Sequence, residues 1–264
     1  MSVVEPGMNI LVLALVALQE PAKQDAPKQD GLAVVMEAAQ KLMAKKNYSF
    51  KTTMKLDGDD ALKAVFEKSE QDVTGVFQKE SVLHAKAEEI ECARNGGDAL
   101  FLYNKKWRNR EDTNKLFKNK LDSPTRTFDS LDNPHDEIGS VREKVGTLEA
   151  KGTEALNGAD CTKFEGALTD DGASMLAKIY FGRLRVKGAG RKGGQAEPVA
   201  ASGKATVWLS KDGIPVQLLY DMSFKVVAGK SEWKASLVRT VCVADLDAAK
   251  LELPADVRKQ LKID

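Results

Sequence analysis

Apolar and polar residues change from a helical to a strand pattern near residue 47. Residues 31–46 place apolar side chains on one helical stripe, and Asp30 can cap the first turn, so this pattern predicts an amphipathic helix. Between Tyr48 and Asp57 apolar and polar residues alternate, which is typical of a strand with one buried and one wet face. Together the two segments predict a helix that docks on an apolar surface, followed by a half-buried strand.

The most regular alternation lies between Val216 and Val226, where six consecutive alternate positions are apolar. An Asp-Gly turn precedes this run and an Ala-Gly-Lys turn follows it, so we expect antiparallel neighbours at 204–210 and 231–244. Arg239 interrupts the apolar face of the last strand, and it marks either the rim of the sheet or a polar contact. Three long antiparallel strands therefore follow one another near the end of the chain.

Shorter alternating runs predict the rest of the sheet. We expect further strands at 62–67, 73–79, 81–93, 98–103, 147–156 and 160–168. We expect short helices at 137–144, 170–181 and 254–262. A sheet of about ten strands curls, so the chain is predicted to be mainly β with a few helices (α+β). The expected architecture is a curved antiparallel sheet or unclosed β-barrel with helices over its concave face, and it forms one domain over 31–264.

The first thirty residues differ in character from the rest. Residues 10–18 form a nine-residue apolar run, whereas a membrane-spanning helix needs about 20 residues. The run fits the apolar region of a secretory signal, although Glu5 and the lack of Lys or Arg before it are unusual for one. We expect a signal peptide at 1–20 and a flexible linker at 21–30, hence a periplasmic or otherwise exported location; the alternative is a buried N-terminal segment.

Composition narrows the classes of function. The chain carries 40 Lys and Arg against 39 Asp and Glu, so a strongly cationic nucleic-acid binder is not expected. Two His and three Cys leave little for a metal site or a disulfide framework, and we expect no cofactor. The number of cysteines is odd, and all three lie in strand-like surroundings, so buried, inert thiols are favoured. They are Cys92, Cys161 and Cys242.

Three motifs carry possible chemistry, and each has a simpler explanation. Residues 132–137 include His135 among carboxylates, which favours a helix cap over a metal site. Acidic residues at 88, 89 and 91 lie close to Lys86 and Arg94, which favours ion pairs over acid–base catalysis. Residues 188–193 fit G-x-G-x-x-G, but no helix pattern follows, so a loop is expected. We therefore expect no catalytic residues and no enzyme.

Basic residues gather in two stretches, at 105–120 and 178–192. Solvated loops that balance acids elsewhere explain them most simply. Contact with anionic lipid head groups, worth about 1 kcal/mol per Lys or Arg near a membrane, or with an acidic envelope protein is the alternative. The residues that would make this contact are Arg183, Arg185, Lys187 and Arg191.

Several segments together resemble the outer-membrane lipoprotein carrier superfamily, which comprises periplasmic lipoprotein-localisation proteins and their lipid-binding lipoprotein relatives. The resemblance is carried by the helix at 31–46 and, in order, by YSFKTTMKL (48–56), LNGADCTKFEG (156–166), VWLSKDGIPVQL (207–218) and LELP (251–254). The basic insertion at 183–195 and the cysteines do not match a carrier. The order and spacing of the matching segments extend over nearly the whole chain after the linker.

The resemblance implies a hydrophobic concavity that is lidded by helices, holds acyl chains and uses neither catalytic residues nor metal. It implies that six side chains face this concavity: Phe50, Met54, Leu218, Tyr220, Met222 and Phe224. The function expected is that of a non-enzymatic exported monomer that binds an acyl chain, a lipid or a lipidated protein. The alternative is an envelope module that senses stress or binds a protein partner and holds no lipid.

Overall fold

The computed structural model describes residues 30–66, 69–79, 81–88, 90–117, 123–128, 131–183 and 196–263. The expected signal peptide, nearly all of the linker and the glycine-rich segment 188–193 lie outside these residues. Among the described residues, no helix is both long enough and apolar enough to cross a bilayer.

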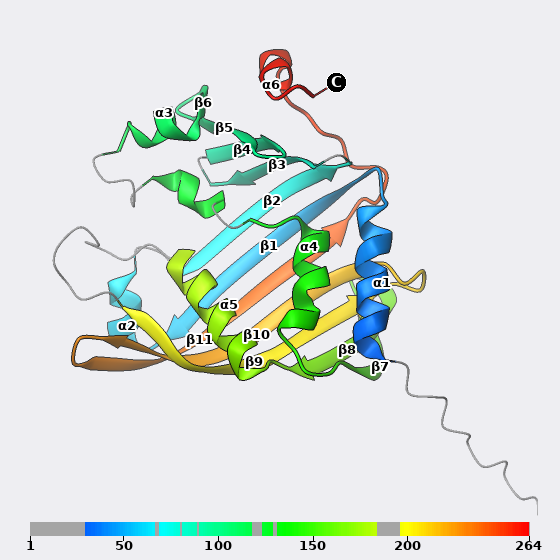
Figure 1. Ribbon diagram of the computed structural model, residues 1–264, viewed down its shortest axis with the longest axis vertical. Coiled ribbons are helices and arrows are strands. Elements are labelled where there is room, and N and C mark those ends of the chain that lie inside the picture. The colour runs from blue at the N-terminus through cyan, green and yellow to red at the C-terminus, as the bar shows by residue number, and fades with distance from the viewer. Residues whose placement is uncertain are drawn as a thin grey trace, which may run out of the picture.

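The described chain forms one antiparallel sheet of eleven strands in the order β6-β5-β4-β3-β2-β1-β11-β10-β9-β8-β7. Two meanders, β1 to β6 and β7 to β11, meet where β1 pairs with β11 (Figure 1). The mainly β, open and curved architecture is therefore confirmed. The strands are β1 (Asn47–Gly58), β2 (Glu70–Gln78), β3 (Val82–Ala87), β4 (Ile90–Asn95), β5 (Asp98–Tyr103), β6 (Lys106–Asn109), β7 (Glu149–Leu156), β8 (Ala159–Ala167), β9 (Glu197–Leu209), β10 (Pro215–Ala228) and β11 (Ser231–Ala244).

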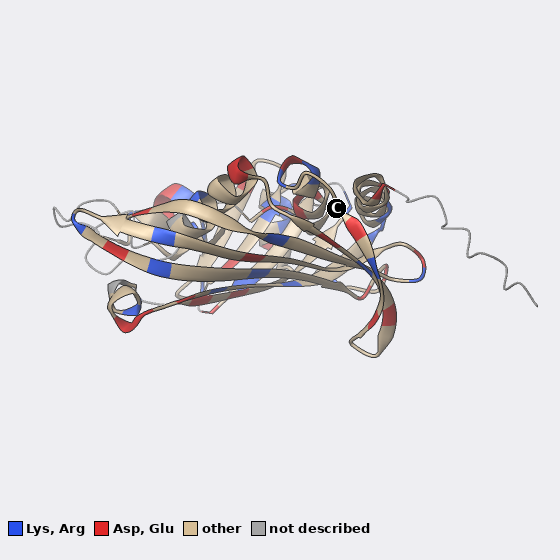
Figure 2. Cartoon of the chain, turned by 90° about the horizontal axis from the view of Figure 1, so that it is seen from below, with Lys and Arg blue, Asp and Glu red and all other residues tan. Residues whose placement is uncertain are grey.

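Helices cover one face of this sheet, which we call the inner face; the opposite side is the outer face. The helices α1 (Gly31–Met43), α4 (Pro134–Gly139) and α5 (Asp170–Arg183) lie across the inner face, and an edge-on view places them on one side of the strands (Figures 1 and 2). The shorter helices are α2 (Asp60–Val65), α3 (Arg110–Asn114), η2 (Pro124–Phe128), η3 (Ser140–Glu143) and α6 (Ala255–Gln260).

The main hydrophobic core lies between the inner face and its helices, because the alternate apolar positions of the long strands all point there. Helix α1 begins at the Asp30 carboxylate, which accepts from the Leu32 amide at 3.0 Å, and it buries Val35 and Leu42. A second, smaller cluster lies on the outer face of β3 to β5, where Val257 and Leu261 of the C-terminal segment pack. The sheet thus carries a hydrophobic cluster on each of its two faces at β3 to β5.

Strand β7 forms one edge of the sheet, and nearly all of its side chains are exposed. Its pairing with β8 shifts register between Ala150 and Thr153, where Gly152 adopts a φ of 91°. This is a β-bulge, and glycine fits it because a side chain at positive φ would be strained.

Two sequence predictions were wrong. Residues 62–67 were expected to form a strand, but α2 occupies this segment because the Asp59 carboxylate caps it, accepting from the Leu62 amide at 2.7 Å. Residues 81–93 were expected to be continuous, but they form β3 and β4. The chain turns at Glu88, whose φ of 49° is left-handed. Strand β6 was not predicted.

Candidate functional site

The six side chains predicted to face a concavity all point to the inner face. They come from β1 and β10, the two strands that flank β11. Each is buried, with at most 4% of its surface exposed. Protein groups cover them in this structure, so their role as ligand contacts stays a prediction. They are Phe50, Met54, Leu218, Tyr220, Met222 and Phe224.

Helix α5 covers the part of this apolar face formed by β9 and β10. The Phe181 ring packs edge-on against Phe224 and Phe66, with centroids 6.1 and 5.3 Å apart. Helix α1 lies over the other end of β10 and packs against α4. The cover therefore consists of separate short helices, each of which buries apolar side chains against the strands.

A buried ion pair interrupts the apolar inner face. Arg239 of β11 is 2% exposed, and its Nε and Nη2 donate to the two carboxylate oxygens of Glu137 in α4 at 3.2 and 3.0 Å. The Tyr180 hydroxyl of α5 donates to Glu137 Oε1 at 2.8 Å, and the Arg239 guanidinium lies over the Tyr180 ring. Of the two readings of Arg239 from the sequence, the polar contact is confirmed and the rim is wrong. These contacts join the sheet to α4 and α5.

The charges of this pair depend on one another. Burial disfavours the charged guanidinium, but the Glu137 carboxylate outweighs this effect and raises the pKa of Arg239 above its ordinary value. Removing one partner from a buried pair leaves a charge without compensation, which is strongly unfavourable. The pair therefore holds only while α4 lies on the sheet.

Two buried hydroxyls near Arg239 lack a hydrogen-bond partner among the described residues: Tyr220 Oη and Thr52 Oγ1. Tyr220 lies directly opposite Arg239 in the β10–β11 pairing, and Thr52 faces inward opposite Val241, two residues further along β11. Burial, with Tyr180 and Glu137 nearby, raises the pKa of Tyr220, so its phenol stays protonated and can donate. We call Glu137, Tyr180, Tyr220 and Arg239, together with Thr52, the Arg239 cluster.

A second polar contact fixes α4 to β1. Tyr48 Oη and His135 Nδ1 share a hydrogen bond of 2.7 Å, and the His135 ring meets Phe77 edge-on. Burial lowers the pKa of His135, although Asp136 opposes this effect. His135 also lines a groove of about 260 Å³ between α1 and α4, together with Met36 and Met43. Its ring is thus a buried structural contact of α4, and the expected helix cap is not seen, since Asn133 stands at the N-cap without a side-chain cap bond.

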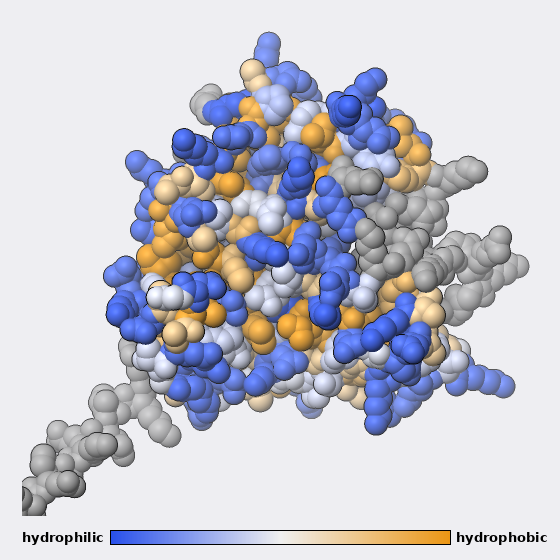
Figure 3. Space-filling model, turned by 180° about the vertical axis from the view of Figure 1, so that it is seen from behind, coloured by the Kyte–Doolittle hydropathy of each residue, from blue (hydrophilic) through white to orange (hydrophobic). Residues whose placement is uncertain are grey.

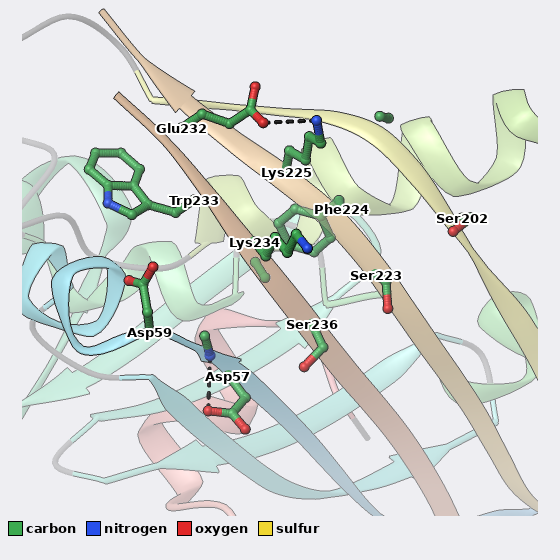
Figure 4. A pocket seen from close by; sticks show the side chains of 13 residues that line it. Asp57, Asp59, Ser202, Ser223, Phe224, Lys225, Glu232, Trp233, Lys234 and Ser236 are labelled. Carbon is green, nitrogen blue, oxygen red and sulfur yellow. Dashed lines mark hydrogen bonds and ion pairs between the residues drawn. The ribbon is translucent and has the colours of Figure 1, made fainter. Parts of the chain in front are cut away.

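The outer face carries a different kind of surface. Ser202, Ser223 and Ser236 align across β9, β10 and β11 on the floor of a groove of about 850 Å³ (Figure 4). The Lys225–Glu232 ion pair of 2.8 Å flanks this groove. Seen from this side, hydrophilic residues spread over the molecule with apolar ones scattered among them (Figure 3). Serine hydroxyls and charged side chains thus line part of this groove, in contrast with the apolar inner face.

The described residues offer few candidates for metal binding or for thiol chemistry. No group of three or more His, Cys, Asp or Glu side chains among the described residues could hold a metal ion. All three cysteines are free thiols, and Cys92 and Cys161 are buried as predicted. Burial raises the pKa of Cys92 to about 12, so its thiol is a poor nucleophile.

The structure tests one of the predicted ion pairs, but the residues of the predicted head-group contact are not described. Glu91 pairs with Lys86 at 3.4 Å, as predicted, and also with His84 at 3.0 Å, while Glu89 lies outside the described residues. Arg183 ends α5, but its side chain is not described, and the other three residues of that prediction also lie outside: Arg185, Lys187 and Arg191. The head-group contact stays a prediction.

The described chain is an open antiparallel sheet with helices over a buried apolar face, which is the architecture expected from the resemblance. Similar solved structures include Mycobacterium tuberculosis lipoprotein LppX (13% identity, 83% of this chain and 96% of that chain, TM-score 0.40) and LprF from Mycobacterium bovis (10%, 84% and 95%, TM-score 0.34). A LolA-superfamily protein from Nitrosomonas europaea matches with 8% identity over 87% and 97% and a TM-score of 0.28. We infer neither a family nor a ligand from these matches. No protein-family model and no curated protein matches the sequence.

Proposed function

We propose that this chain is a non-enzymatic, exported binding protein that holds the acyl chains of a lipid or lipidated protein between its inner face and α1, α4 and α5. The observation that supports this most is the cover of the inner face. Separate short helices, rather than a second sheet, bury the apolar side chains of β1 and β10. Such helices can lift individually, and an acyl chain can replace them.

The free energies on the two sides of such an exchange are similar in size. Burying a large apolar side chain contributes roughly 1.5–3 kcal/mol, and each buried CH2 about 0.8 kcal/mol. When α5 lifts, Leu176 and Phe181 lose their contacts with the sheet. An acyl chain supplies a comparable area of CH2 groups to the same strands. The face therefore keeps most of its burial whether helix or lipid covers it.

We also propose a cell-envelope location, because residues 1–20 fit a signal peptide. The basic run that begins at Arg183 continues directly from the end of α5, and this continuity supports the proposal that it meets anionic head groups at a membrane surface. We propose no reaction, since the described inner face offers an ion pair and hydroxyls but no paired nucleophile and base.

The test is to purify the full chain from its own cells, extract it and identify co-purifying lipids by mass spectrometry. A fluorescent alkyl probe then measures binding to the delipidated protein. Met222→Gln, on the inner face, should reduce bound probe, whereas Ser223→Gln, the next residue on the outer face, is the matched control and should not. A lipid-free protein that shows no saturable probe binding would contradict the proposal and favour a protein-binding envelope module.

A further inference from the structure

We propose that the Arg239 cluster is a buried anion site, and that the cargo is an amphiphile with a carboxylate head, such as a long-chain fatty acid, which enters head first. The ligand carboxylate would replace the Glu137 carboxylate on the Arg239 guanidinium. This rests on the proposed acyl-chain function and adds the charge and the orientation of the cargo.

The first reason is the position of the charge. Arg239 lies on β11, the strand between the apolar rows of β1 and β10, and only 2% of it is exposed. Glu137, its partner, belongs to the helical cover and not to the sheet. If α4 moved aside for a neutral alkyl chain, the guanidinium would stay in apolar surroundings without a counter-charge. A carboxylate that arrives with the chain removes this penalty.

The second reason is the geometry of the existing pair. Glu137 binds Arg239 in a bidentate manner, with one carboxylate oxygen on Nε at 3.2 Å and the other on Nη2 at 3.0 Å. This is the arrangement in which guanidinium groups bind planar carboxylates most strongly. Glu137 therefore acts as an internal stand-in for a ligand head group, and the guanidinium edge is already oriented to receive one.

The third reason is the pair of hydroxyls that the closed form leaves without partners. Tyr220 Oη and Thr52 Oγ1 are buried on the same face as Arg239, and Glu137 uses neither of them. Buried polar groups without partners are costly and rare. A carboxylate that seats deeper on the sheet than Glu137 can accept from the Tyr220 hydroxyl, which lies directly opposite Arg239. The ligand-bound state then satisfies a donor that has no partner among the described residues.

The experiment compares palmitate with methyl palmitate and hexadecanol on the delipidated full chain, by displacement of a neutral alkyl probe. We expect palmitate to bind at least about tenfold more tightly than the two neutral compounds, since a hydrogen bond to a charged group contributes about that factor. Tyr220→Phe should reduce this preference by about threefold to tenfold, because it removes a donor to the carboxylate. Glu137→Gln should raise palmitate affinity, because the competing charge is gone.

Lys234→Met, on the outer face, is the control for non-specific attraction of anions and should leave the preference unchanged. Thermal unfolding provides the second readout: Tyr220→Phe removes an unpartnered hydroxyl and should raise the Tm of the ligand-free protein. A raised Tm with an unchanged preference for palmitate would show a purely structural cluster and overturn the inference. Equal binding of all three compounds overturns it too, while the acyl-chain function stands. Failure of all three to bind overturns the function itself.

Discussion

The two faces of the sheet are built from alternate residues of the same strands, yet the charged groups of the two faces differ in their exposure to water. On the outer face, Lys225 and Glu232 pair with 46% and 54% of their side chains exposed. On the inner face, Arg239 and Glu137 pair with 2% and 5% exposed. Exposed pairs are screened by water and contribute little, whereas a buried pair carries a desolvation penalty that only its partner offsets. A charged group on the inner face therefore needs its partner far more than a charged group on the outer face does.

The strongest way to test this difference is to remove one carboxylate from each face. Glu137→Ala should lower the free energy of unfolding by about 3–5 kcal/mol, because it leaves Arg239 buried and unpaired. Glu232→Ala, on the outer face, should change it by less than about 0.5 kcal/mol. Urea unfolding of both variants measures the effect. Equal losses would show that the inner pair is as well solvated as the outer one.

Adjacent leucines on β10 offer a matched comparison of packing. Leu218 is fully buried on the inner face, whereas Leu219 is half-buried on the outer face. Leu218→Ala should cost about 2–5 kcal/mol through lost transfer energy and the cavity that remains. Leu219→Ala should cost less than about 1 kcal/mol, since water already reaches this side chain. The comparison fails if the two urea midpoints shift by the same amount.

The pH dependence of stability tests the buried contact between His135 and β1. Burial lowers the pKa of His135 below its usual 6.5, against an opposing effect of Asp136. The unfolded state then binds the proton more readily, so the stability that His135 contributes is complete above pH 6.5 and is lost as the pH falls through the folded-state pKa. His135→Gln should flatten the fall in Tm between about pH 7 and 5. Ser223→Gln, on the outer face, leaves His135 in place, adds no titratable group and should keep the wild-type slope.

The smallest effect is expected at the second cluster, on the outer face. Leu261→Ala weakens the packing of α6, but this segment can detach without opening the main core. We expect global stability to fall by about 1 kcal/mol or less, with faster hydrogen exchange confined to α6 and β3 to β5. Faster exchange in β10 or β11 would show that the two clusters unfold as one unit.

Local patterns predicted most of the strands, because each long strand alternates along its own sequence. The run from Val216 to Val226 is β10, and the two hairpins that flank it are confirmed. Errors arose where one backbone angle or one cap decides the outcome. The left-handed φ at Glu88 divides a run that alternates on both sides, and the Asp59 cap turns a strand-like segment into α2.

The candidate site was harder to predict from the sequence, because its contacts join residues that lie far apart along the chain. The alternation predicted that Tyr220 and Met54 point inward. It could not show that Arg239 between them pairs with Glu137, which lies 102 positions away. The interruption of an apolar row by one Arg was the available signal, since a charge on a buried face needs a partner. Which residue pairs with Arg239 depends on where α4 packs on the sheet.

The bulge in β7 has a consequence for the behaviour of many copies of this protein. An edge strand offers free backbone groups to any other strand, and open sheets are therefore prone to grow by adding neighbours. At Gly152 the run of evenly spaced groups is broken, and Glu149 and Lys151 place charges beside the break. A strand from a second molecule could match only one side of the bulge. The irregularity thus opposes the addition of a further strand at the β7 edge.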